Sequence, residues 1–298
     1  MIARKMFPEG SIHHLIICDH IGDFLITMGY VNAFKVSHGI EALTIYVAPK
    51  MESLARRYMG EQDRVVCLNR RKLEAVLYLT TSHQTNDWIR KRGNLWIMEP
   101  TGHFNDKCFR FMLPFPGMTL RRIIQYGCLL LPEVAEFKPL PLNPYLKKGK
   151  EGGGRVVLCP TARAYWIEKV PLHLWEKLAE VLCGEGAEVY TNLAISDEKK
   201  TPLQGTKPLM LSLEDLETWL APNDYMIGLR SGLMDFAAYL DCRQICLYPP
   251  KSGYGDFFSL DMLPQTRSRY IEYELTDNLE WDILEIMSIM KSFAAEVK

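Results

Sequence analysis

The stretch HHLIICDHIGDFLIT (13–27) decides the fold, because an apolar run typical of a buried strand leads directly into a helix that opens with Gly-Asp. The run at 13–18 predicts a strand, and a helix follows from about residue 23 to residue 37. The positions on the inner face of this helix are Phe24, Met28, Val31 and Phe34 or Lys35. A strand followed at once by an amphipathic helix is the first half of a strand–helix–strand unit, and such units build parallel sheets.

The same alternation runs along the whole chain. In the first half we predict strands at 42–49, 64–69, 75–80 and 94–98, with helices at 51–59 and 118–131. In the second half we predict strands at 155–160, 187–192, 224–229 and 244–250, with helices at 171–186, 213–221, 231–240 and 276–297. The sequence therefore predicts an α/β protein whose parallel sheets are covered by helices on both faces.

A linker divides the chain near its middle. The segment KPLPLNPYLKKGKEGGG (138–154) combines prolines, lysines and a glycine run, a composition typical of connections between domains. We place the boundary there and expect two Rossmann-like domains, at 1–146 and 147–298. The closing helix at 276–297 either belongs to the second domain or packs back on the first.

The overall composition excludes several classes of protein. The 298 residues are 48% hydrophobic and 24% charged, as in globular proteins, and 35 Lys and Arg against 36 Asp and Glu leave no basic excess for nucleic acid. No apolar stretch is long enough for a secretory signal or a membrane span, so membrane contact would be peripheral at most. Eight scattered cysteines without C-x-x-C spacing favour reduced thiols, and we expect a cytoplasmic protein, free or at the inner face of the membrane.

The loops after the strands carry the candidate chemistry, because open parallel sheets bind ligands beyond the carboxyl ends of their strands. In HIGDFLIT (20–27), Gly22 allows a tight turn and a close approach of ligand, and Asp23 starts the helix. A carboxylate there could act as a general base, or it could simply cap the helix. This segment alone favours the cap.

Two loops of the second half contain residue types that are typical of phosphate-binding sites. The loop CPTARAYWIEKVP (159–171) offers Thr161, Arg163 and Lys169 ahead of a helix, although it could be an ordinary polar loop. In GLRSGLMDFAAYL (228–240), the amides of Ser231 and Gly232 open a helix, with Arg230 before them and Asp235 one turn later. That pattern fits an anion site or a plain capped helix.

A fourth loop, LYPPKSGYGDFF (247–258), could hold a base or sugar by stacking, with Lys251 near the ligand, or could be a rigid turn without a function. Other chemistries lack their motifs: there is no G-x-G-x-x-G, Walker loop, D-x-D or G-x-S-x-G. The seven histidines show no metal spacing, so we expect no metal and no cofactor.

Three stretches together resemble the lipopolysaccharide heptosyltransferase family (glycosyltransferase family 9). They are IGDFLIT (21–27), CPTARAYWIEKVPLHLWEKLAEVLCGEGAEVY (159–190) and LSLEDLETWLAPNDYMIGLRSGLMDFAAYLDCRQICLYPP (211–250), and their order and spacing match through nearly the whole chain. The resemblance implies the GT-B fold, in which two Rossmann-like domains face each other across a cleft. It also implies Asp23 as the catalytic base. Its donor-diphosphate positions fall on Thr161, Arg163, Lys169, Ser231 and Gly232.

The sequence departs from the family where the donor binds. Arg230 stands in place of the family's acid, and Asp235 stands at the place of its histidine. The resemblance therefore does not imply ADP-heptose as the donor, and Arg230 could instead strengthen diphosphate binding.

We expect an inverting, metal-independent glycosyltransferase that moves a sugar from a nucleotide-diphosphate donor to a cell-surface glycan or lipid-linked precursor. Two other functions stay open: a nucleotide-sugar epimerase or hydrolase on the same scaffold, and a non-catalytic sugar-nucleotide-binding protein.

Overall fold

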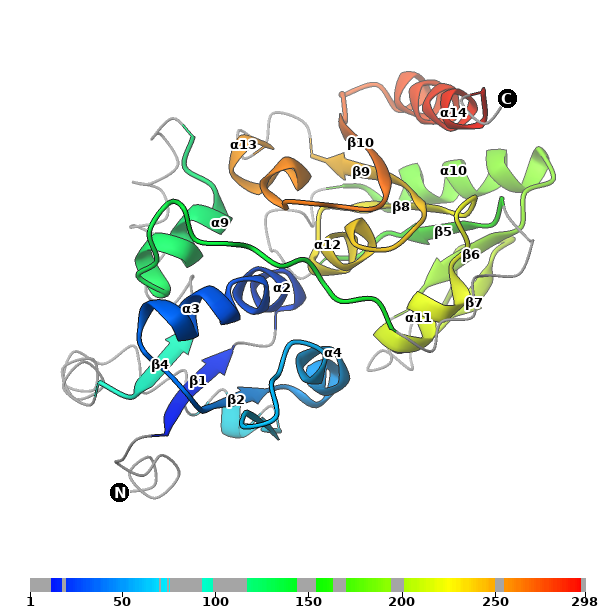
Figure 1. Cartoon of the computed structure of the whole chain (residues 1–298). Coiled ribbons are helices and arrows are strands. Elements are labelled where there is room, and N and C mark those ends of the chain that lie inside the picture. Colours follow the sequence, from blue (N-terminus) through cyan, green and yellow to red (C-terminus); the bar gives the residue numbers. More distant parts are fainter. Residues whose placement is uncertain are drawn as a thin grey trace. The chain divides into compact units, whose positions relative to one another are not determined.

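The computed structural model describes residues 12–17, 20–69, 71–73, 75, 93–98, 117–143, 154–162, 170–193, 201–249 and 255–295. They belong to two compact units, each with its own parallel sheet (Figure 1). The first comprises Met1–Asn143, Asp256–Phe258 and Met262–Pro264, and the second comprises Pro144–Gly255, Ser259–Asp261 and Gln265–Lys298. The predicted α/β class with parallel sheets is confirmed.

The first unit has four described strands in the order β3-β2-β1-β4, and every neighbouring pair is parallel. The strands are β1 (His13–Ile17), β2 (Leu43–Val47), β3 (Arg64–Cys67) and β4 (Leu95–Met98). The described helices are α2 (Ile21–Gly29), α3 (Val31–Ser37), α4 (Glu52–Arg56) and α9 (Leu120–Arg122), with the 3₁₀ turn η1 (Pro49–Met51) and the π-helical turn η2 (Ile123–Cys128). The strand predicted at 75–80 lies outside the described residues except for residue 75.

The single helix expected up to residue 37 is instead two helices, α2 and α3, which meet at Tyr30. The segment after η2 crosses this junction: the carbonyl of Gly29 accepts a hydrogen bond from the amide of Lys138 at 2.8 Å, and Phe137 packs edge-on against Tyr30. A Cβ at Gly29 would lie 2.2 Å from the Phe137 ring. Tertiary packing that needs glycine here therefore interrupts the helical pattern.

The second unit has six described strands in the order β10-β9-β8-β5-β6-β7, all parallel. They are β5 (Val156–Cys159), β6 (Val189–Asn192), β7 (Lys207–Leu209), β8 (Tyr225–Leu229), β9 (Arg243–Tyr248) and β10 (Arg269–Glu274). Its described helices are α10 (Leu172–Gly184), α11 (Leu213–Trp219), α12 (Gly232–Ala238) and α14 (Leu279–Ala295). The short helix α13 (Gly255–Phe258) and the 3₁₀ turn η3 (Leu260–Met262) are divided between the units, because Asp256–Phe258 and Met262 belong to the first.

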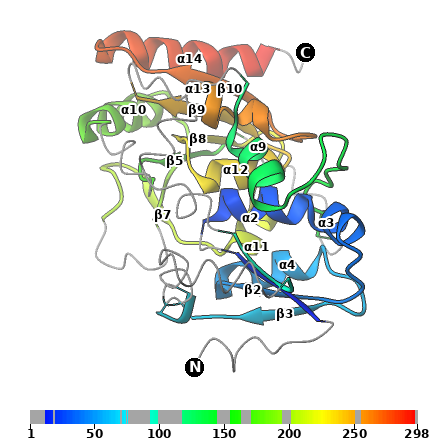
Figure 2. The same cartoon turned by 90° about the vertical axis from the view of Figure 1, so that its left-hand side faces the viewer.

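Helices cover both faces of this second sheet. On one face α10 and α14 lie side by side, and they share a buried core with residues of β5, β6, β8 and β9 (Figure 2). Strand residues alternate between faces, so Gly228 points the other way, where Met234 of α12 packs against it. Within its own unit α14 buries Ile283, Ile286 and Met287 in the shared core. The expectation that this helix also packs back on the first domain stays a prediction.

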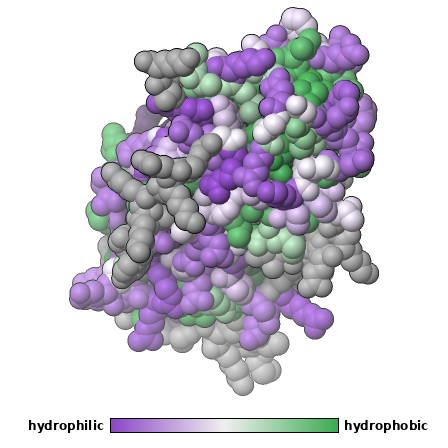
Figure 3. Space-filling view, turned by 90° about the vertical axis from the view of Figure 1, so that its right-hand side faces the viewer, coloured by the Kyte–Doolittle hydropathy of each residue, from purple (hydrophilic) through white to green (hydrophobic). Residues whose placement is uncertain are grey.

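The surface is of ordinary polarity where it is described. Hydrophilic side chains cover much of the face seen in Figure 3, with hydrophobic areas between them. None of the helices formed by the described residues has the length and apolar character that crossing a membrane requires.

Candidate active site

Asp23 is the third residue of α2 and is buried, with only 6% of its surface exposed. Its backbone carbonyl accepts a hydrogen bond from Thr27 Oγ1 at 2.7 Å, and its carboxylate Oδ2 lies 3.7 Å from Nδ1 of His20. The position before the helix belongs to His20, whose side chain makes no capping hydrogen bond. The reading of Asp23 as the N-cap is therefore wrong, and Gly22 lies buried in the same first turn.

In the second unit, β5 is the strand where the chain order reverses: β6 and β7 follow on one side, and β8 to β10 follow on the other. Such a reversal leaves a crevice at the carboxyl ends of the two central strands, and ligands of open α/β sheets bind there. Cys159, the last residue of β5, is in register with Gly228 of β8. Thr161 and Arg230 follow these two residues closely, so both predicted donor residues lie at the switch point.

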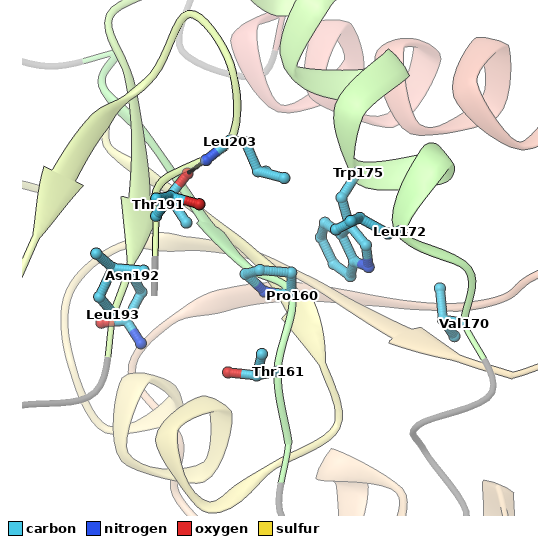
Figure 4. Close-up of a pocket in the computed structure, with 10 residues that line it drawn as sticks. Pro160, Thr161, Val170, Leu172, Trp175, Thr191, Asn192, Leu193 and Leu203 are labelled. Carbon is cyan, nitrogen blue, oxygen red and sulfur yellow. Dashed lines mark hydrogen bonds between the residues drawn. The ribbon is translucent and has the colours of Figure 1, made fainter. Parts of the chain in front are cut away.

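A cavity of about 390 Å³ opens beside this point, within the second unit. Thr161 lines it, as Figure 4 shows, together with residues of β6, α10 and the loops around them. The other lining residues are Pro160, Val170, Leu172, Trp175, Thr191, Asn192, Leu193, Thr201 and Leu203. Apolar walls with a few polar groups, at this volume, are typical of small-molecule sites.

The polar groups that line this cavity differ in whether they already form hydrogen bonds within the protein. The Thr191 hydroxyl is within hydrogen-bond distance of Thr206 at 2.6 Å and accepts from the amide of Leu203 at 3.1 Å, so it belongs to the scaffold. The indole Nε1 of Trp175 is buried and has no hydrogen-bond partner among the described residues. A buried N–H without an acceptor is costly, which distinguishes Trp175 from the other residues that line the cavity.

Arg230 and Asp235 form a buried ion pair. Nη1 of Arg230 lies 2.6 Å from Oδ1 of Asp235, and the two side chains are 5% and 4% exposed. Burial raises the pKa of the Asp235 carboxyl, and Arg230 offsets only part of this rise. Burial alone would lower the pKa of Arg230, but the negative groups around it, Asp235 first, hold that pKa above its usual value. The two charges cancel, so this pair adds no net positive charge to the edge of the sheet.

Ser231 and Gly232 are placed as predicted at the opening of α12. Ser231 is the N-cap in extended conformation, without a side-chain capping bond, and Gly232 is the first helical residue. Arg230 Nη1 also donates to the carbonyl of Ser231 at 3.2 Å, so the pair is attached to the start of the helix. Arg163, Lys169 and Lys251 lie outside the described residues.

Sequence reasoning missed three features of the two units. Trp175 has the spacing of a core position in the helix predicted at 171–186, so its sequence does not mark it as a site residue. His20 was not predicted either, although it stands three residues before Asp23. A polar network also closes the end of β9: Glu272 accepts from Tyr248 Oη, from Ser259 Oγ at 2.5 Å and from the amide of Leu260 at 2.7 Å. No sequence pattern indicated Glu272 as a site residue, because the strand that contains it was not predicted. The part of the chain that the structure describes contains no group of three or more His, Cys, Asp or Glu residues that could hold a metal ion.

Comparison with known proteins finds solved structures with a similar fold. No protein-family model matches the sequence, and no curated protein matches it either. The structure of E. coli ADP-heptose LPS heptosyltransferase II matches over 95% of this chain and 99% of its own, with a TM-score of 0.59 and 16% identity. The fold resembles that of the heptosyltransferases.

Two further structures agree. The glycosyl transferase family 9 protein from Veillonella parvula covers 94% of this chain and 89% of its own, with a TM-score of 0.53 and 12% identity. E. coli heptosyltransferase WaaC with ADP covers 94% and 99%, with a TM-score of 0.51 and 12% identity. The resemblance predicted from three short stretches is thereby confirmed at the level of the fold, across nearly the whole chain.

Proposed function

We propose that this protein is an inverting, metal-independent glycosyltransferase that moves a sugar from a nucleotide-diphosphate donor to a cell-surface glycan or its lipid-linked precursor. The observation that carries the proposal is the length of the fold match, 95% of this chain and 99% of the heptosyltransferase II chain. A match of that extent includes both α/β units. The matched WaaC structure is one with ADP, which supports a nucleoside diphosphate as part of the donor.

In the proposed reaction, the oxygen of an acceptor hydroxyl attacks the anomeric carbon of the donor sugar. The bond from that carbon to the diphosphate breaks, Asp23 takes the acceptor proton, and the nucleoside diphosphate leaves with the bonding electrons. Hydrogen-bond donors and positive charges that the protein holds in place stabilise the negative charge that develops on the diphosphate. We assign this role to Thr161, Arg163, Lys169, Arg230, Ser231 and Gly232, with Asp235 acting through Arg230.

The cavity beside Thr161 suits the nucleoside part of the donor. Its volume of about 390 Å³ lies in the range of small-molecule pockets, and Trp175 and Asn192 bring hydrogen-bonding groups to largely apolar walls. The diphosphate would then lie at the switch point, between the ends of β5 and β8. This arrangement supports binding of the donor by the second unit.

A second candidate is a non-catalytic protein that binds sugar nucleotides. The observation that favours it is the buried Arg230–Asp235 pair. Asp235 already neutralises the guanidinium at the edge of the sheet where the nucleotide sugar would bind. This candidate predicts nucleotide binding without any transfer of sugar.

The test uses ADP-, GDP-, UDP- and dTDP-sugars with a panel of glycan acceptors, and it measures nucleoside diphosphate release with and without acceptor. We expect acceptor-dependent release, which Asp23→Asn lowers about 10²- to 10⁴-fold while nucleotide affinity is unchanged. Glu41→Gln, at an exposed acid of the same unit, is the matched control and should keep full activity. Undiminished turnover in Asp23→Asn would contradict the assignment of the base.

A further inference from the structure

His20 lies directly before α2, with φ −97° and ψ 123°, at the position where a side chain usually caps a helix. Its imidazole makes no capping hydrogen bond. The ring instead brings Nδ1 to within 3.7 Å of Oδ2 of Asp23, three residues later. The side chain at the entrance of this helix is therefore directed to the carboxylate and not to the helix amides.

The two members of this pair differ sharply in exposure. The side chain of His20 is 53% exposed, whereas that of Asp23 is 8% exposed. Since Nδ1 faces the carboxylate, Nε2 on the far side of the ring faces away from it. A separation of 3.7 Å is longer than a hydrogen bond, and catalytic hydrogen bonds are often long without substrate and shorten when it binds.

The backbone of the first turn keeps the two residues together. The amide of Phe24 donates to the carbonyl of His20 at 3.0 Å, and Thr27 Oγ1 donates to the carbonyl of Asp23 at 2.7 Å. The distance between the side chains therefore varies only through their own rotations. Shortening the 3.7 Å separation to hydrogen-bond range therefore requires a rotation of one or both side chains.

We propose that His20 is a positioning residue for Asp23, an inference that rests on the function proposed above. Its Nδ1–H donates to Oδ2 and fixes the plane of the carboxylate that takes the proton of the acceptor hydroxyl. His20 itself does not touch the reacting atoms, and it takes up no proton in this scheme.

The kinetic test compares His20→Ala with His20→Asn, because the asparagine amide keeps an N–H donor near the place of Nδ1 and has no ring that can accept a proton. We expect His20→Ala to lower kcat about tenfold with the donor KM unchanged, and His20→Asn to restore kcat to within about twofold of the parent. Equal losses in the two variants would overturn the proposal, because the imidazole would then be needed as a base. Full activity of His20→Ala would also overturn it.

A second readout needs no activity. The ¹⁵N NMR signals of the His20 ring, in the full chain without substrate, should show a larger share of the Nδ1–H tautomer than in Asp23→Asn, because the carboxylate 3.7 Å from Nδ1 favours a proton on that nitrogen even before the hydrogen bond shortens. His173, exposed on α10, is the internal control and should not respond. Identical His20 signals in the parent and in Asp23→Asn would overturn the pairing. Absence of sugar transfer by the parent protein would instead contradict the proposed function, and the NMR result would still test the pair.

Discussion

Individual residues of the site were predictable where their place in the chain pattern marks them. Asp23 and Thr161 stand just after apolar runs, at positions that become the carboxyl ends of parallel strands, so their location followed from the pattern. Trp175 and His20 were not predictable in the same way. Trp175 occupies a core position of an amphipathic helix, and only the three-dimensional structure shows that its N–H lacks a described acceptor.

The pairing of Arg230 with Asp235 was also outside the reach of sequence reasoning, which assigned both residues to the donor. A residue five positions along a strand-to-helix turn can point in many directions, and only the start of α12 at Gly232 brings Asp235 back to Arg230. A buried pair of this kind contributes little net stability, because desolvation of the two charges offsets their attraction, but losing one partner leaves a buried charge.

We therefore predict that Asp235→Asn lowers the free energy of unfolding by about 3 kcal/mol, whereas the double variant Arg230→Met/Asp235→Leu stays within about 1 kcal/mol of the parent. Urea unfolding of the full chain, followed by circular dichroism, measures both. Glu180→Gln, which breaks the exposed pair with Lys177, is the control and should leave the midpoint unchanged. A double variant as unstable as the single one would contradict this account of the pair.

At the scale of elements, the packing of α12 on β8 depends on one glycine. A Cβ at Gly228 would lie 2.7 Å from Cβ of Cys159 and 2.9 Å from Sδ of Met234. Because Cys159 ends β5 and Met234 belongs to α12, this contact joins both strands of the switch point to the helix that opens with Ser231 and Gly232. A side chain here therefore requires Cys159 and the Met234 thioether to shift.

Gly228→Ala should accordingly lower the free energy of unfolding by about 1–3 kcal/mol, since the added methyl group overpacks the contact with Cys159 and Met234. Gly184→Ala is the matched control: a Cβ there meets no atom within 4 Å, and alanine in place of glycine favours a helix, so its stability should be equal or higher. Thermal unfolding of both variants provides the measurement. Equal behaviour of the two would show that the close approach at Gly228 has no consequence.

Most elements were predictable, and the exceptions have physical reasons. The runs of buried residues in β1, β2, β5, β8 and β9 are continuous, so their sequences alone indicated strands. The edge strands β7 and β10 were missed, because they are partly exposed and lack such runs. The start of α11 has a regular cap, since Ser212 Oγ accepts from the amide of Asp215.

For the whole molecule, the pattern of strands and helices proved more informative than residue identity. The fold match spans 95% of the chain at 16% identity, so this structural match depends mainly on the order of the elements. The identity of a donor was less accessible from sequence: the strand ends indicated a candidate site for a ligand, but no residue pattern indicated a particular nucleotide. In the proposed function, that choice would depend on the shape and hydrogen-bonding groups of the cavity beside Thr161.

The measurement that tests the central claim most directly is thermal unfolding of the full chain with ADP, GDP, UDP, dTDP or CMP, each in the presence of EDTA. A ligand at about 100 times its Kd stabilises the folded state by about 2.7 kcal/mol, enough to raise the melting temperature by several degrees. We predict a clear upward shift with one of the nucleoside diphosphates, retained in EDTA. No shift with any of the five nucleotides would contradict the proposal that this protein uses a nucleotide-sugar donor.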